Sequence, residues 1–408
     1  MKHLRPFIFL SVAFAALPLL AEEIKIDADF PGGNIKVVSI DGDNVKLAQD
    51  LRDTAGSWFY WTFRIRGAEG RTLHFSLPGV VGARGPAISH DGINWHWLSD
   101  KAGFSGDKFD YIFKQDEKEV YFSQCINYTE KHLNLFLEKY KNNPALKVES
   151  LCITKKGRNV ELLRIAGNKK EPGFQIFLTS RHHCAETMAT YTLEGIIETA
   201  LSDTDDGHWL QDHADLFIVP LVDKDGVEDG DQGKNRKPHD YELDYKQPIY
   251  TAVQAITEQV PKWLNGKPLF FMDMHCPWLR NGDDPTNIKK GTNEYFYFVG
   301  IDPDLYGEKF WKEAQRFGTI LEKERQGTIP YRERNNLKFG ILWNVPSNYK
   351  YPKLYCTGWG AMLPNTVFAS PLELPFANAE GIVVDADSAR ALGNDLARAI
   401  RAYLEALE

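Results

Sequence analysis

Three short apolar runs, separated by segments with helical periodicity, constrain the fold of this chain more than any other feature. The runs are FQIFLTS (174–180), DLFIVPLV (215–222) and LFFMDMH (269–275). Helical periodicity appears in four segments, 187–201, 250–264, 308–324 and 387–408. Apolar β-type runs that alternate with helices predict an α/β domain whose central sheet is covered by helices on both faces.

The sequence before this region has a different pattern, with short alternating runs separated by Gly, Asp and Pro. In WFYWTFRI, for example, alternate residues from Phe59 to Ile65 fall on one face of a strand. Short strands at this spacing predict an all-β sandwich. We therefore expect an N-terminal β-sandwich domain over residues 22–148 and an α/β domain over residues 149–408, which suits a chain of 408 residues.

The first 21 residues have the layout of a secretory signal peptide. Lys2 and Arg5 give a basic start, residues 7–20 are largely apolar, and Ala21 precedes two acids. A membrane anchor is the alternative, but about 14 residues are fewer than the ~20 that a spanning helix needs. We expect export, to the periplasm or out of the cell, after removal of residues 1–21, and no membrane span in the mature chain.

Charge and cysteine content narrow the class of partner and the redox chemistry. The formal net charge of −8 argues against nucleic acid and anionic membrane surfaces as partners, because proteins bind both through basic surfaces. Five cysteines are an odd number and few for an exported chain of this size, so we expect no disulfide framework. Cys125 and Cys152 could pair, and buried free thiols are the alternative.

Polar side chains follow the apolar runs at the strand ends where sheets of this kind bind ligands. His183 and Glu186 come after the first run, and His275 ends the third. Two His and one Glu form the ligand set of a catalytic zinc, which keeps a fourth position open for water. Asp273 points to the same side of its strand as His275 and can orient that imidazole. The alternative is that Glu186 only favours the start of a helix.

Hydrolysis at such a metal also needs a base and a group that stabilises an oxyanion. Glu373 stands in the apolar segment VFASPLELPF, where burial would raise its pKa toward the range of a general base. An exposed strand residue is the alternative for Glu373. Arg236 is the candidate cation, ahead of Arg181, because a guanidinium stays charged and pairs well with a polarised carbonyl. A surface salt bridge is the alternative for both arginines.

Together these residues resemble the motifs of the zinc metallocarboxypeptidases, in particular of the branch related to cytosolic carboxypeptidases. RHHCAET (181–187) is similar to the R-x-H-P-G-E-T signature of that family, with Cys184 and Ala185 as departures. PLVDKDGV (220–227) is similar to its P-x-x-x-x-D-G-V segment, and DMH (273–275) to its D-x-H. The branch also carries a β-sandwich before the catalytic domain, so the resemblance covers nearly all of the mature chain.

The resemblance implies a carboxypeptidase-like central mixed sheet and a zinc metallopeptidase that acts on a peptide or a peptide-like substrate. It implies Zn²⁺ on His183, Glu186 and His275. It also implies that Glu373 is the base and proton shuttle and that Arg236 polarises the scissile carbonyl.

One departure concerns the end of the substrate. Relatives continue the GKNR-x-PHD segment into an Asn-Arg pair that clamps a terminal carboxylate, whereas Glu242 and Leu243 stand here. Neither side chain can hold a carboxylate, and Glu242 would repel one. Three explanations compete. Another basic residue, Arg280 or Lys289, supplies the clamp, or the substrate is a cell-wall peptide or another amide without a free terminal carboxylate. In the third explanation, the protein binds its ligand without cleaving it.

Overall fold

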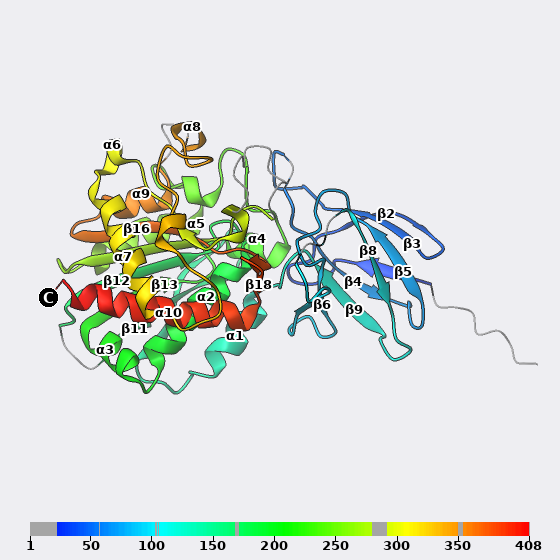
Figure 1. Ribbon diagram of the computed structural model, residues 1–408, viewed down its shortest axis with the longest axis horizontal. Coiled ribbons are helices and arrows are strands. Elements are labelled where there is room, and N and C mark those ends of the chain that lie inside the picture. The colour runs from blue at the N-terminus through cyan, green and yellow to red at the C-terminus, as the bar shows by residue number, and fades with distance from the viewer. Residues whose placement is uncertain are drawn as a thin grey trace, which may run out of the picture.

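A computed structural model describes residues 23–56, 58–102, 104, 106–167, 171–279, 292–349 and 354–407. The predicted signal peptide, residues 1–21, and the two alternative clamp residues Arg280 and Lys289 lie outside the described residues. Within these ranges, no helix is both long and apolar enough to cross a membrane. Figure 1 shows two parts, a body of strands and helices coloured green to red and a part made of strands in blue and cyan.

The N-terminal part consists of two β-sheets packed face to face. The five-stranded sheet, in the order β1-β4-β9-β6-β7, contains Lys25–Asp27, Thr62–Arg66, Glu119–Ser123, Ala87–Ser89 and His96–Trp97. The four-stranded sheet, in the order β2-β3-β5-β8, contains Lys36–Asp41, Asn44–Ala48, Thr72–Ser76 and Lys108–Ile112. Rings from the two sheets meet in the core, where the centroids of Phe63 and Phe75 are 6.0 Å apart. The predicted β-sandwich is confirmed.

The strand predicted from Phe59 to Ile65 begins later than expected, because β4 starts only at Thr62. Gln232, from the other part of the molecule, gives the reason. Its side chain accepts a hydrogen bond from the backbone N–H of Tyr60 and donates one to the Tyr60 carbonyl, both at 2.7 Å. The backbone before β4 is therefore paired with a loop of the C-terminal part and not with a neighbouring strand.

Seven strands form the central sheet, in the order β10-β11-β13-β12-β14-β16-β15. In chain order their bounds are Leu146–Ile153, Asn159–Ile165, Phe174–Ser180, Ala214–Val219, Leu269–His275, Tyr297–Phe298 and Thr366–Glu373. β12, β13, β14 and β16 are parallel, whereas β10, β11 and β15 are antiparallel to their neighbours. The sheet is mixed, as predicted, and the predicted boundary between residues 148 and 149 falls inside β10.

Helices cover both faces of the central sheet. Their bounds are α1 Glu130–Glu138, α2 Thr187–Leu201, α3 Asp205–His213, α4 Lys224–Asp229, α5 Thr251–Trp263, α6 Pro303–Tyr306, α7 Lys309–Glu324, α8 Pro346–Tyr349, α9 Cys356–Ala361 and α10 Ala386–Glu405. α2, α7 and α10 share the larger hydrophobic core on one face, and α5 and α9 share the core on the other. The smaller elements are 3-10 turns at Tyr241–Leu243, Thr292–Glu294 and Glu333–Asn335, and the strands β17 (Asn378–Ala379) and β18 (Ile382–Val383).

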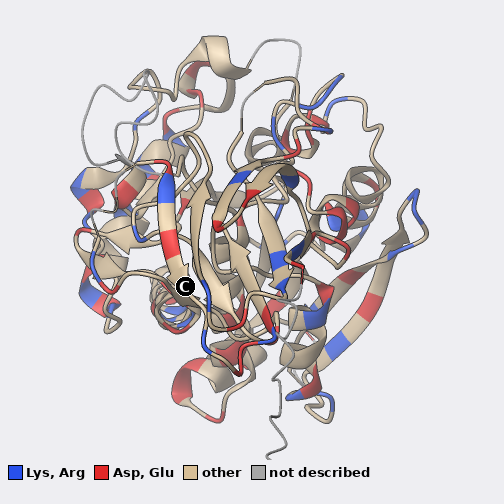
Figure 2. Cartoon of the chain, turned by 90° about the vertical axis from the view of Figure 1, so that its right-hand side faces the viewer, with Lys and Arg blue, Asp and Glu red and all other residues tan. Residues whose placement is uncertain are grey.

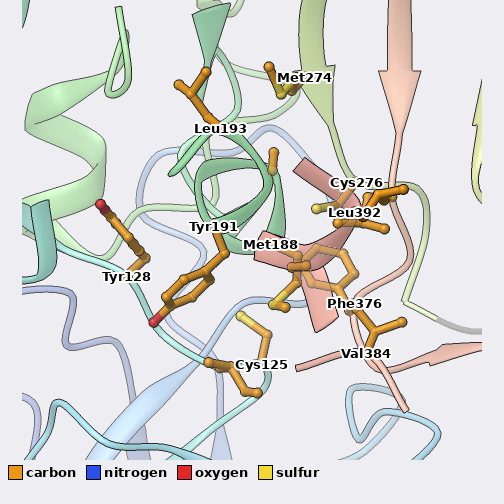
Figure 3. Close-up of a cluster of buried hydrophobic side chains, with 14 of the residues drawn as sticks. Cys125, Tyr128, Met188, Tyr191, Leu193, Met274, Cys276, Phe376, Val384 and Leu392 are labelled. Atoms are coloured by element: carbon orange, nitrogen blue, oxygen red, sulfur yellow. The ribbon is translucent and has the colours of Figure 1, made fainter. Parts of the chain in front are cut away.

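α2 packs closely against the end of β14 and against α10. In Figure 3, Met188 and Leu193 of α2 lie with Met274 and Cys276 from the end of β14 and with Leu392 of α10. α2 and α10 approach so closely that a Cβ added to Gly195 would lie 2.0 Å from the carbonyl oxygen of Arg390. The position of the first turn of α2 is therefore determined by the core.

Acidic and basic residues are interspersed along the ribbons in the view of Figure 2.

Candidate active site

The ends of three neighbouring strands bring the predicted site residues together. β12, β14 and β16 are adjacent and parallel, with His275 paired in register with Glu373 and Met274 with Ser180. The loop from Arg181 to Glu186 follows β12 directly. Because parallel strands end at one edge of a sheet, residues separated by about 90 positions become neighbours there.

His183, Glu186 and His275 form one compact group. Their ligand atoms all lie within 4.8 Å of one another. His183 Nδ1 lies 2.9 Å from Glu186 Oε1, and His275 Nδ1 lies 2.8 Å from Glu186 Oε2. Burial alone would raise the pKa of Glu186, but the two imidazoles hold it at about 2. A buried carboxylate thus faces the Nδ1 atoms of two buried rings.

This donor set fits a zinc ion. Two imidazoles and one carboxylate are the ligands of many catalytic zinc sites. Nδ1 of both His183 and His275 faces the Glu186 carboxylate. Nε2 of each ring is therefore on the opposite side, where it can donate a hydrogen bond to another group. The structure therefore brings the three predicted ligands together, and their role as ligands stays a prediction.

Asp273 lies behind His275, as the sequence predicted from their spacing. Its Oδ2 is 2.8 Å from His275 Nε2, and its Oδ1 is 2.9 Å from His182 Nδ1. The hydroxyl of Thr179 donates to Oδ1 at 2.7 Å. Three polar groups therefore share this carboxylate, which fixes the orientation of the His275 ring.

His182 has a role that the sequence reasoning missed. Besides Asp273, it contacts the hydroxyl of Tyr245, 2.7 Å from its Nε2, and its side chain is fully buried. His182, Asp273 and His275 form a second candidate group of ligand atoms. Asp273 already contacts Thr179, His182 and His275, which favours a role in orienting the rings over a role as a metal ligand. In the sequence, only the adjacency of His182 and His183 pointed to this residue. It did not indicate that His182 contacts Asp273 while His183 contacts Glu186.

Glu373 ends β16 with its side chain turned into the site. The residue is only 9% exposed, so the alternative of an exposed strand residue is wrong. Burial raises the pKa of Glu373 to about 8. Its Oε2 is buried and has no hydrogen-bond partner among the described residues, and the same is true of the hydroxyl of Tyr297, its partner across β15 and β16. Unpaired buried oxygens beside this candidate ligand group are available to a substrate or to water.

The two cations of the GKNR segment differ in their contacts. Arg236 pairs with Asp53 and Asp231, both at 3.0 Å, and with Asp223. Lys234, by contrast, places its Nζ 3.0 Å from His183 Nε2. Lys234 is therefore the cation in direct contact with the predicted ligands, and no motif in the sequence indicated it.

Asp53 belongs to the N-terminal part and anchors this segment. It accepts hydrogen bonds from the backbone N–H groups of Gln232 and Gly233, both at 2.9 Å, in addition to pairing with Arg236. The β-sandwich thus holds the loop that carries Lys234 against the strand ends.

Glu242, which stands where the resemblance implies the first clamp residue, also faces His183. Its Oε2 lies 3.1 Å from His183 Nε2 and 3.4 Å from Lys234 Nζ. Asp240 is farther away, with Oδ2 at 3.9 Å from the same ring nitrogen. The departure in the sequence therefore places an acid at the ligand group.

All five cysteines are free thiols, so Cys125 and Cys152 form no disulfide. Cys184 is buried, and its Sγ contacts the carbonyl oxygen of Asp231 at 3.1 Å. Burial raises the pKa of Cys184 and of Cys276 well above the ordinary value of a thiol. No cysteine of the described chain belongs to a candidate group of metal ligands.

Two family models match this sequence. Residues 131–252 match the model described as zinc carboxypeptidase, and residues 26–124 match the model described as the cytosolic carboxypeptidase N-terminal domain. The first match contains His183, Glu186 and Arg236 and ends before His275 and Glu373.

Similar proteins include cytosolic carboxypeptidase 6 of Caenorhabditis elegans, 26% identical over 345 residues that cover 74% of each chain. An uncharacterized protein of Zymomonas mobilis is 24% identical over 214 residues, and the match spans about half of both chains, 50% of this one and 54% of that one. Among solved structures, a metallo-carboxypeptidase from Burkholderia cenocepacia has a TM-score of 0.73 at 20% identity, with 95% of this chain and 100% of that chain covered. A metallo-carboxypeptidase from Pseudomonas aeruginosa in complex with (2-guanidinoethylmercapto)succinic acid has a TM-score of 0.73 at 21% identity, with coverages of 94% and 100%.

The solved structures extend the likeness in fold to the strands that carry His275 and Glu373. The two family matches follow each other in the order of the two predicted domains. The sequence motifs, the mixed central sheet and these matches all indicate the same family. The chain therefore belongs to the zinc carboxypeptidase family of metallopeptidases, with an N-terminal domain of the cytosolic carboxypeptidase kind.

Proposed function

We propose that this protein hydrolyses a peptide or amide bond with the help of a zinc ion held by His183, Glu186 and His275. The observation that carries the proposal is the position of this group beside Glu373, whose buried Oε2 is unpaired within the described chain. Zinc bound there would polarise the scissile carbonyl and make water a better nucleophile near neutral pH.

Glu373 is the base in this proposal. Its free Oε2 accepts a proton from the attacking water, and the same carboxyl group then donates that proton to the leaving amine. A pKa of about 8 means that the carboxyl group holds a proton more firmly than an exposed glutamate does, which suits the second step. Asp273 supports the reaction indirectly, by fixing the His275 ring.

The cation that faces the scissile carbonyl is a separate part of the proposal. The resemblance assigns this role to Arg236, whereas the contact with His183 favours Lys234. If Arg236 acts, Arg236→Gln should lower kcat by about 10²–10³-fold, as loss of an oxyanion donor does, and Lys234→Gln should change kcat less. Kinetics of both variants, with melting temperatures to verify folding, test this, and the opposite order would assign the role to Lys234.

The residues that replace the carboxylate clamp determine which terminal group of the substrate can bind. Glu242 is charged and only 15% exposed, and Leu243 cannot pair with an anion. We therefore propose a substrate without a free carboxylate at this position, such as a cell-wall peptide or an amidated peptide.

Pairs of peptides that differ only in a terminal carboxylate or carboxamide test this proposal. We expect each carboxamide to be cleaved at least about tenfold faster, because a desolvated like-charge contact costs at least about 1.4 kcal/mol. Faster cleavage of the free acids would contradict this and would indicate a clamp from another residue. Bound zinc without cleavage of any peptide would favour a binding protein that has lost turnover.

Export is also proposed, on the composition of residues 1–21 alone. Sequencing the N-terminus of the protein purified from its source would then find a chain that begins near Glu22. A chain that still begins at Met1 would contradict export through this segment.

A further inference from the structure

The ring of His183 has a different group on each of its nitrogens. Nδ1 lies 2.9 Å from Glu186, toward the centre of the ligand group. Nε2, on the other side of the ring, lies 3.1 Å from Glu242 Oε2, 3.0 Å from Lys234 Nζ and 3.9 Å from Asp240 Oδ2. The side chain is only 3% exposed, so these groups and not bulk water must satisfy Nε2.

Metal binding determines where the proton of this ring sits. When Nδ1 donates its lone pair to a metal ion, the single proton of the neutral imidazole is on Nε2. A buried N–H needs an acceptor, because an unpaired donor loses the hydrogen bond that it makes with water in the unfolded chain. Lys234 cannot accept, since an ammonium group has donors only. The acceptor must therefore be a carboxylate.

Two carboxylates stand near Nε2, and their distances differ. Glu242 Oε2 is within hydrogen-bond range at 3.1 Å, whereas Asp240 Oδ2 is beyond it at 3.9 Å. Lys234 also approaches Glu242 Oε2, at 3.4 Å, and this ion pair keeps the carboxylate next to the ring. Asp240 Oδ1 has no hydrogen-bond partner among the described residues.

We propose that Glu242 is a positioning residue that accepts the Nε2–H of His183 and so directs Nδ1 to the metal. The proposal rests on the zinc site proposed above. Asp273 contacts His275 Nε2 at 2.8 Å in the same way, so each predicted histidine ligand has its own carboxylate. The acid at position 242 then contributes to metal binding, at the position where the resemblance implies a substrate clamp. Loss of such an orienting carboxylate typically weakens metal binding by about 10–100-fold.

Zinc affinity of the full chain, measured by competition with a chelator, tests this inference. Glu242→Met removes the acceptor at similar size and should weaken zinc binding by about 10–100-fold. Glu242→Gln keeps a carbonyl oxygen and should stay within about threefold of the wild type, since an amide oxygen also accepts a hydrogen bond. Asp240→Asn is the matched control, and we expect its affinity to equal that of the wild type.

The outcomes separate the inference from the proposed function. Wild-type affinity in Glu242→Met, or a loss in Asp240→Asn alone, would overturn the role of Glu242 and leave the zinc site intact. Absence of zinc binding by the wild type would overturn both. If Glu242→Met does not fold, NMR of the zinc-loaded wild type gives the answer, because the inference requires a His183 Nε2–H signal that exchanges slowly with solvent, and its absence would contradict the inference.

Discussion

Replacing Glu373 by glutamine should lower peptide hydrolysis by about 10²–10⁴-fold, the usual contribution of a general base, while the zinc content stays at the wild-type level. An amide has nearly the shape of the carboxylate but cannot take a proton from water. Since Oε2 of Glu373 makes no hydrogen bond within the described chain, the substitution removes no structural contact there. The expected loss is therefore chemical and should appear in kcat more than in KM.

Steady-state kinetics and metal analysis of the same preparation check this result. Glu380→Gln is the matched control, because Glu380 is exposed and its ion pair within the described residues is with Arg332, at 3.4 Å. Its kinetics should equal those of the wild type. A Glu373→Gln variant that binds zinc normally and hydrolyses peptides at the full rate would show that the base has been assigned to the wrong residue.

Replacing His183 or His275 by alanine should remove the bound zinc and with it all measurable hydrolysis. Each variant leaves only two of the three protein ligands, which is one fewer than catalytic zinc sites usually have. Metal analysis after dialysis measures the result, and melting curves establish that each variant is folded.

The neighbouring histidine supplies the decisive comparison. His182 acts on the site through Asp273, so His182→Ala should weaken zinc binding by about 10–100-fold at most, as loss of an orienting contact does. His208, which is 60% exposed, is the control for the substitution itself, and His208→Ala should bind zinc like the wild type. If His183→Ala kept its zinc and His182→Ala lost it, the ligand would be His182.

The parts of the fold that could be predicted are those with strong local patterns. β12, β13 and β14 are continuous apolar runs, and α2 and α7 have clear helical periodicity, so the sequence indicated each within a few residues. β10 escaped prediction because most of its side chains are exposed and the apolar alternation at Leu146 and Val148 does not continue past Glu149. β16 contains Ser370 and Pro371 among its apolar residues and did not have the pattern of a strand.

The candidate site could be predicted where it lies at the ends of those recognisable strands and, for Glu373, where a lone acid stands in an apolar segment. His183, Glu186 and His275 follow strand ends, and the order of the strands brings them together. The contacts of Lys234 could not be foreseen, because they depend on Asp53, 180 positions before Gly233 in the sequence and in the other part of the molecule. Such contacts between distant loops have no periodicity and leave no local signal.

Zinc content and peptide hydrolysis, measured on one preparation of the wild-type protein, test whether this chain is a zinc-dependent hydrolase. We expect about one zinc ion per chain, removable by a chelator, and hydrolysis that stops on removal and returns when zinc is restored. A protein that binds no zinc, whose melting temperature does not change when zinc is added, would contradict the proposed site on His183, Glu186 and His275.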